Sequence, residues 1–300
     1  MSTSQISYCD KTLNPWTGCT PCSPGCDNCW AKCLLTTRLK HHFEGDPWKV
    51  TIHPVRFRQF EVKGKPKRIF VCSQSDFFHE TIPFDAKAGR FIDMLNNDLH
   101  TWLILTKRIE SAVAFFSEFR FKSYPVELIY PKQIWFGLTI VNQDEADKKI
   151  PLLKQIPVKN KFLSLEPLIG PVDLTKVLPS PLGEGSGVRW VIVGGESGPN
   201  ARPMHPDWVR NIKKQCEAAG VAFYFKQWGQ WRRGHTYMKK NIQLLNNGEY
   251  SDWDNDQEFI ELTENFKEWR KMRPVIMSNV GKAKAGHTLD WKEYRQISEN

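Results

Sequence analysis

The segment Arg189-Trp190-Val191-Ile192-Val193-Gly194-Gly195-Glu196-Ser197-Gly198 joins a run of apolar, mostly β-branched residues to a polar, glycine-rich end. A short apolar run bounded by turn residues is typical of a buried strand. The segment therefore predicts a strand over residues 189–194, with polar side chains directly after it.

Further segments repeat this pattern, and helical spacing separates several of them. Strands are expected at 68–72, 101–106, 133–139, 161–165 and 221–225. Apolar residues recur at helical intervals in 91–99, 150–156 and 207–219. Strands that alternate with helices pair in parallel through βαβ units. The class is thus α/β, and six or seven units fit a complete or partial parallel β/α barrel.

The pattern weakens after Trp231. Residues 232–300 mix charges, glycine and tryptophan, with one strand-like run at Val275-Ile276-Met277. We therefore expect a barrel with its cysteine-rich loop over 1–231. A C-terminal extension over 232–300 is expected to pack on the barrel or cover its mouth.

Polar groups follow almost every predicted strand. In a parallel sheet the carboxyl ends of the strands meet at one edge, where sites form. Any one of these groups also suits a cap or a turn, but together they indicate a site. They include Ser73, Ser75, Asp76, Lys107, Thr139, Asn142, Ser164, Glu166, Gly194, Gly195 and Lys226.

Composition and charge limit the cellular location and the class of partner that we expect. No run of apolar residues is long enough to span a membrane, and the first residues lack the features of a signal peptide. A cytoplasmic location is therefore expected, where clustered cysteines are more often metal ligands than disulfides. The net charge of +9 favours a polyanionic partner, although a solvated basic surface explains it as well.

Four cysteines lie within eleven residues, at positions 19, 22, 26 and 29. Structural zinc sites usually separate two pairs of ligands by a dozen or more residues. Iron–sulfur clusters accept closely spaced thiolates, because the ligands bind different irons. The spacing favours an iron–sulfur centre over zinc, and zinc over unligated thiols.

The run Cys22-x-x-x-Cys26-x-x-Cys29 resembles the motif of the radical S-adenosylmethionine (SAM) superfamily. In that superfamily three cysteines hold a [4Fe–4S] cluster, and SAM binds the remaining iron. One departure is Asn28, because the residue before the last cysteine is often aromatic in the superfamily. The aromatic residue here is Trp30.

The chain also resembles the phage Gp37/Gp68 family, a group of unknown function, over nearly its whole length. The shared motifs are Leu13–Cys19, Ser23–Ala31, Trp190–Gly198, Ala201–Pro203, Phe225–Gly229 and Val280–Gly286. The resemblance implies Cys19, Cys26 and Cys29 as the ligand triplet. Superfamily spacing implies Cys22 in place of Cys19, and the two alternatives stay open.

The superfamily resemblance implies tasks for the strand-end residues. Asp76 suits the ammonium group of SAM, and a helix cap explains it equally well. Aromatic side chains beside basic ones resemble base-stacking surfaces, although aromatic residues usually fill cores. The implied SAM contacts are Ser73, Ser75, Asp76, Thr139, Asn142, Glu166, Gly194 and Gly195. The implied substrate contacts are Lys107, Arg202, Lys226 and Trp228.

The expected function is that of a radical SAM enzyme with a [4Fe–4S] cluster and SAM as cofactors, and a flavodoxin- or ferredoxin-like reductant. Charge and the phage resemblance favour a nucleic acid or nucleotide substrate, with base modification or repair as the outcome. Two alternatives are a zinc-bearing nucleic-acid-binding protein without catalysis, and an interaction or defence protein with a structural iron–sulfur cluster.

Overall fold

The structure, a computed structural model, centres on a sheet with the strand order β1-β2-β5-β6-β7-β8-β9-β10. It describes residues 2–4, 6–42, 44–121, 131–179, 187–233, 241–244, 248, 250–252, 275–280 and 282–298. The strands from β2 to β10 run parallel, and β1 is antiparallel to β2. Their bounds are β1 Ser2–Thr3, β2 Lys11–Leu13, β5 Arg68–Val71, β6 Thr101–Thr106, β7 Ile134–Thr139, β8 Asn160–Leu165, β9 Val188–Gly194 and β10 Ala222–Gln227.

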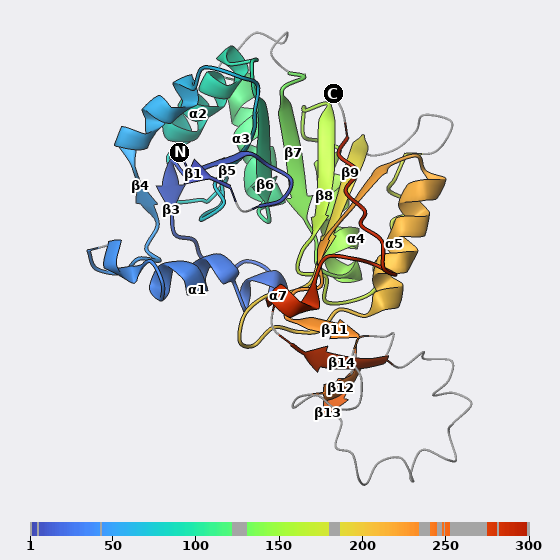
Figure 1. Ribbon diagram of the computed structural model, residues 1–300. Coiled ribbons are helices and arrows are strands. Elements are labelled where there is room, and N and C mark those ends of the chain that lie inside the picture. Colours follow the sequence, from blue (N-terminus) through green and yellow to red (C-terminus); the bar gives the residue numbers. More distant parts are fainter. Residues whose placement is uncertain are drawn as a thin grey trace, which may run out of the picture.

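Seven parallel strands of the described chain form a curled half-barrel, with helices on its outer face (Figure 1). Four helices connect successive strands, namely α2 (Phe84–Asn96), α3 (Ile109–Phe121), α4 (Gln143–Leu153) and α5 (Pro206–Ala218). The connection from β2 to β5 holds the short elements β3 (Trp16–Thr17), η1 (Pro24–Cys26), α1 (Trp30–Thr36), η2 (Lys40–His42), β4 (Thr51–Ile52) and η3 (Pro54–Glu61). The fold class expected from the sequence is therefore confirmed as a partial barrel.

Alternation along the strands builds a separate core on each face of the sheet. Helices cover one face, where Ile69 and Val71 of β5 join the larger core. Phe70 lies between them and points to the concave face. There it belongs to a second cluster of Tyr8, Phe70, Leu103, Trp135, Phe162, Trp190, Ile192 and Tyr224. Gly137 of β7 leaves room for it, because a Cβ atom there would lie 2.2 Å from the Phe162 ring.

The predicted strands and helices agree with the structure to within a few residues at most ends. The strand expected over 189–194 is β9, and the helix expected over 207–219 is α5. Gly220 follows α5 with φ of +65°, as its place at the helix end predicts. Helix α3 was not predicted, and the strand expected before the cysteine loop, which is β2, was given no residue range.

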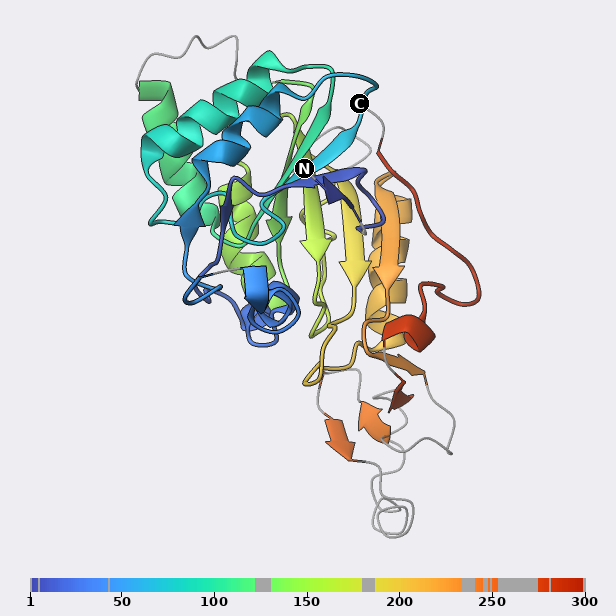
Figure 2. The ribbon, with the colours of Figure 1, turned by 60° about the vertical axis from the view of Figure 1, so that its left-hand side comes forward.

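The chain after Trp231 forms a second, smaller sheet of β11 (Trp231–Arg233), β12 (Asn241–Leu244), β13 (Tyr250–Asp252) and β14 (Val275–Asn279). Helix α7 (Lys282–Ala285) follows, and the chain then runs back along β10 (Figure 2). The backbone N–H of Phe225 donates to the Tyr294 carbonyl at 2.8 Å. The strand-like run at 275–277 is thus confirmed. The division at residue 231 stays a prediction, because much of 232–300 lies outside the described residues.

Within the described residues, every helix is too short or too polar to cross a membrane.

Candidate functional site

The four clustered cysteines face one cavity at the carboxyl end of the parallel strands. The loop that carries them leaves β3, passes through η1 and ends at α1. Cys19, Cys22, Cys26 and Cys29 all line a cavity of about 470 Å³, together with residues that follow β5, β6, β8 and β9. Helices α1 and α7 flank this end of the sheet (Figures 1 and 2).

Two glycines let the cysteine loop lie this close to the sheet. Gly18 has φ of +81°, and a Cβ atom there would lie 2.3 Å from the Lys49 carbonyl oxygen. At Gly25 a Cβ atom would lie 2.8 Å from Val141, just after β7. A side chain at Gly25 would push the loop away from the mouth of the half-barrel, and one at Gly18 would push it away from the backbone of Trp48 and Lys49.

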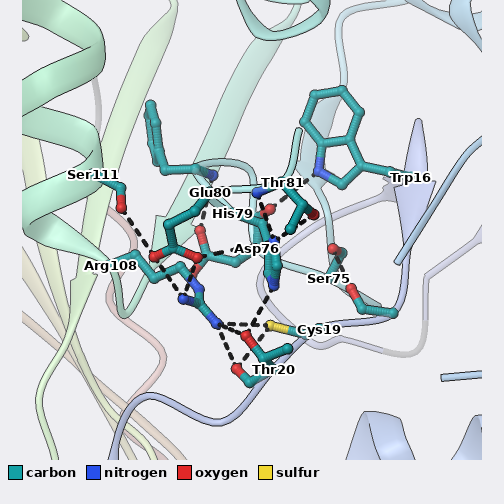
Figure 3. Close-up of polar contacts among 12 residues, drawn as sticks. Trp16, Cys19, Thr20, Ser75, Asp76, His79, Glu80, Thr81, Arg108 and Ser111 are labelled. Carbon is teal, nitrogen blue, oxygen red and sulfur yellow. Dashed lines mark hydrogen bonds and ion pairs between the residues drawn. The ribbon is translucent and has the colours of Figure 1, made fainter. Parts of the chain in front are cut away.

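Arg108 fixes the first part of the loop (Figure 3). Its side chain is buried, and it donates to both carboxylate oxygens of Glu80 and to the carbonyl and hydroxyl of Thr20. Its Nη2 also lies 3.7 Å from Cys19 Sγ. The hydroxyl of Thr20 lies 3.0 Å from Nε2 of the buried His79. These contacts tie Cys19 to the ends of β5 and β6.

Arg202 fixes the second part of the loop. It pairs with the buried Glu196, which follows β9, and it donates to the Pro24 carbonyl at 2.8 Å. Asn28, between the last two cysteines, donates to Glu196 at 3.0 Å and to the Asn200 carbonyl at 2.8 Å. The loop is therefore held from both sides of the mouth by side chains of the barrel.

Hydrogen bonding changes the acidity of the thiols. A hydrogen bond between the Cys22 and Cys26 side chains lowers the pKa of Cys26 to about 5 and raises that of Cys22 well above its usual value. Burial raises the pKa of Cys19 to about 11. In the described part of the chain, no three His, Cys, Asp or Glu side chains converge closely enough to hold a metal as they stand.

Two buried hydroxyl groups on the cavity wall have no hydrogen-bond partner. Thr139 at the end of β7 and Ser164 of β8 are each 1% exposed, and they are neighbours in the parallel register. A buried hydroxyl without a partner costs about 1–3 kcal/mol. The cavity therefore offers unfilled hydrogen-bonding capacity to a polar ligand.

An ion pair lies across the cavity from β8 to β10. Lys226 Nζ is 2.7 and 2.8 Å from the two oxygens of Glu166, and Gln227 Nε2 is 3.3 Å from Oε1. Both charged side chains are less than a fifth exposed. These residues, like Lys107 after β6, line the cavity as their positions at strand ends predicted.

A known family matches almost the whole sequence. The family described as "Protein of unknown function (DUF5131)" matches residues 3–298. The chain belongs to the DUF5131 family. The phage Gp37/Gp68 name suggested by the sequence motifs stays a prediction. Among curated proteins, none matches this chain.

Solved structures of spore photoproduct lyase share the general fold with this DUF5131 chain. The lyase complexed with dinucleoside spore photoproduct is 11% identical, with 90% of this chain and 75% of that chain covered and a TM-score of 0.41. A mutant of that lyase with bound AdoMet and the same dinucleoside is also 11% identical, over the same shares, with a TM-score of 0.38. These scores mark a distant likeness, which carries no functional argument.

The polar residues after β5 hold loops of the DUF5131 chain together. Ser75 donates to the Gly18 carbonyl at 2.6 Å, and Ser73 donates to Asn14 at 3.3 Å. Asp76 lines the cavity, yet its carboxylate already accepts hydrogen bonds from the Thr106 hydroxyl and from the backbone of Phe78 and Lys107. The helix cap that the sequence left open for Asp76 is wrong, because the next helix, α2, begins at Phe84 after Pro83; the carboxylate instead fastens a turn by accepting from Phe78 N.

Other predicted contacts lie elsewhere, and we correct them. Asn142 does not line the cavity, because its side chain caps α4 by accepting from Glu145 N at 3.0 Å. Trp228 is buried, and its indole donates to the Thr288 carbonyl and packs on Phe225. Arg202 clamps the cysteine loop, as described above, and does not line the cavity.

The glycine pair after β9 also has an internal explanation. A Cβ atom at Gly195 would lie 2.0 Å from the Trp228 carbonyl oxygen. At Gly194 it would lie 3.2 Å from the Glu166 side chain. The close approach to this backbone that was expected from a nucleotide is instead made by other segments of the same chain.

Several residues of the site had no role assigned from the sequence alone. Glu196 holds the loop, and Trp30, Trp48 and Lys282 line the cavity. Arg108 was expected only as a positive charge at the mouth, and the structure shows that it holds the loop. The charge of Glu196 directly after a predicted strand was the available signal. No local pattern places Lys282 there, because it comes from the far end of the chain.

Proposed function

We propose that the protein is a radical SAM enzyme that acts on a nucleic acid or nucleotide, with base modification or repair as the outcome. The observation that carries the proposal is the shared orientation of the thiols. Four clustered cysteines open onto one cavity at the carboxyl end of a parallel half-barrel. The cavity has the size of a small-molecule site, and its wall holds two unpartnered hydroxyls.

Three thiolates and SAM would complete a [4Fe–4S] cluster, whose soft iron sites suit sulfur ligands. When bound, the cluster and SAM would supply one-electron reductive cleavage of SAM, with the electron from a flavodoxin- or ferredoxin-like reductant, and so hydrogen-atom abstraction from the substrate. The protein's own residues hold the cysteine loop at the cavity, through Arg108 and Arg202.

Cys26 and Cys29 are the ligands that both resemblances share. For the third ligand, the structure favours Cys22. Its thiol interacts with that of Cys26 and lowers the pKa of Cys26, which favours a thiolate there. Cys19 instead lies against Arg108, which binds the loop at Thr20. We therefore assign Cys22, Cys26 and Cys29 to the cluster and leave Cys19 beside it.

Thr139 and Ser164 are the residues that best fit the polar groups of SAM. Both hydroxyls are buried at the cavity wall and lack partners, so that a ligand there would satisfy them. Asp76 already accepts from three donors, and we assign it to the fastening of the loops after β5 and β6. We assign Glu166, Lys226 and Lys107 to the part of the cavity that faces the substrate.

The test is metal analysis of protein purified without oxygen, followed by electron paramagnetic resonance after reduction with dithionite. We expect about four irons per chain and a spectrum that changes when SAM is added. Zinc without iron would support the nucleic-acid-binding alternative. Iron with a spectrum indifferent to SAM would support a structural cluster. Either result would overturn the proposal.

A further inference from the structure

Among the charged side chains that line the cavity, lysines outnumber carboxylates. Three carboxylates line it, and each has internal partners: Asp76 accepts from Thr106, Glu166 pairs with Lys226, and Glu196 pairs with Arg202. Three further lysines line the same cavity, and within the described residues none of them makes an ion pair. They are Lys32, Lys107 and Lys282. The cavity and its rim therefore favour an anionic ligand.

These three lysines come from different elements around the cavity. Lys107 follows β6, and its Cε lies 3.4 Å from the Cβ position of Gly25 in the cysteine loop. It is thus placed to balance the negative charge of the thiolates. Lys32 on α1 and Lys282 on α7 are exposed and line the cavity, and these two helices flank its mouth (Figure 1).

Two tryptophans line the same cavity as Lys32. Trp30 directly follows Cys29 and is 48% exposed, although large apolar side chains are normally buried. Trp48 is half-buried, and its indole N–H is buried without a partner. An exposed indole and a lysine that line the same cavity have the chemistry that stacks a nucleobase and holds its phosphate.

Resting on the proposed function, we propose that this rim binds a single-stranded nucleic acid whose base stacks on Trp30 and whose phosphates contact Lys32 and Lys282. SAM is itself a drug-sized ligand, and together with the cluster it would occupy most of a cavity of about 470 Å³. The substrate would then place only its reacting group inside, with the remaining chain across the mouth. Lysines on both sides of the mouth suit a polymer better than one free nucleotide.

The test measures the binding of fluorescein-labelled ten-nucleotide single strands, one DNA and one RNA, by anisotropy. It uses the full chain without SAM or reductant, because the loop is held by Arg108 and Arg202 in the absence of either. Trp30→Ala is expected to weaken binding by about 5- to 150-fold, the range for the loss of one stacked base. Trp30→Phe is expected to restore most of the affinity, which separates stacking from misfolding.

Matched controls distinguish the rim from a generally basic surface. Trp291→Ala removes a tryptophan that is 96% exposed and lies outside the cavity, and it should leave binding unchanged. The double variant Lys32→Ala/Lys282→Ala should make the salt dependence of log K shallower by about 1.4, for two lost phosphate contacts. Lys63→Ala/Lys65→Ala, in a basic cluster outside the cavity, should leave the affinity within about twofold of wild type.

Three results would overturn the inference. The first is that Trp30→Ala binds the single strands as tightly as the wild type does. The second is that the Trp291 or the Lys63/Lys65 control loses as much affinity as the rim variants do. The third is that duplex DNA or a mononucleotide binds as tightly as the single strands. Tighter binding of either the DNA or the RNA strand would support the inference and would show whether the substrate carries deoxyribose or ribose. Iron content measured on the same samples separates the two proposals, because the binding assay needs no cluster chemistry. Protein without iron that still shows Trp30-dependent binding would overturn only the proposed function.

Discussion

Arg202 grips Glu196 with two hydrogen bonds, from Nη2 to Oε1 at 2.6 Å and from Nε to Oε2 at 2.9 Å. The Glu196 side chain is only 3% exposed, so that its charge depends on this partner. The same guanidinium donates to the Pro24 carbonyl in the middle of the cysteine loop. One ion pair thus connects the end of β9 to the segment that carries the thiols.

Arg202→Ala should therefore destabilise the protein and loosen the loop. It leaves a buried carboxylate without its cation, and because Arg202 is a quarter exposed we expect a loss of about 2–3 kcal/mol in the free energy of unfolding. Urea denaturation measures this value. Lys213→Ala breaks an i,i+4 pair with Glu217, whose side chain is 56% exposed and therefore solvated without its partner, and should cost under about 1 kcal/mol. Equal losses in the two variants would contradict the clamp.

The choice of the third ligand predicts different results for two neighbouring cysteines. Cys22→Ala should lose the cluster, as should Cys26→Ala and Cys29→Ala, with the far-ultraviolet circular dichroism unchanged. Cys19→Ala should keep nearly full iron content, because Arg108 holds Thr20 independently of the thiol. Iron and sulfide assays after anaerobic reconstitution decide between them. The reverse outcome would assign Cys19 and refute the role given to Cys22.

Thr139→Val should separate stability from ligand binding. Valine has nearly the same shape but lacks the hydroxyl that is buried without a partner. The cluster-free protein should gain up to about 1 kcal/mol in the free energy of unfolding, because a desolvated polar group is removed. The cluster-loaded protein should bind SAM about 5- to 10-fold more weakly, the loss of roughly one hydrogen bond. Calorimetric titration measures the second effect. Unchanged SAM affinity would remove Thr139 from the cofactor site.

The lowered pKa of Cys26 predicts selective alkylation in the cluster-free protein. Because the shift is downward, to about 5, the thiolate is present above that pH and is lost as the pH falls through it. Alkylation of Cys26 by iodoacetamide should thus have its midpoint near pH 5, as followed by mass spectrometry of the labelled peptides. In Cys22→Ala the midpoint should rise, because the hydrogen bond that lowers the pKa is gone. A wild-type midpoint near 8.5, the ordinary thiol value, would contradict this assignment.

The sequence predicted the sheet well because its strands are continuous apolar runs with abrupt polar ends. Strand β9 and helix α5 follow directly from such local patterns. Strand β2 was expected before the cysteine loop but could not be given a residue range, because three residues with little apolar character become a strand only by pairing with β5. Helix α3 is apolar over most of its length, so that its periodicity is weak.

The site was predictable in part, for a similar reason. The cysteines and the strand-end residues Lys107, Thr139, Glu166 and Lys226 occupy positions set by strand ends, and they line the cavity. Trp228 was assigned to the substrate from its basic neighbours, yet tertiary packing buries it. Two features depend on contacts between distant segments of the chain, which no local pattern encodes. They are the position of Lys282 at the cavity and the hydrogen bond from Arg202 to the Pro24 carbonyl.

The most direct test of the central claim is the release of 5′-deoxyadenosine from SAM. Anaerobically reconstituted protein is incubated with SAM and dithionite, and the product is quantified by liquid chromatography and mass spectrometry. We predict slow release without added substrate, and no release above background from Cys26→Ala or Cys29→Ala. An iron-loaded protein that releases no 5′-deoxyadenosine, or equal release from the two cysteine variants, would contradict the account.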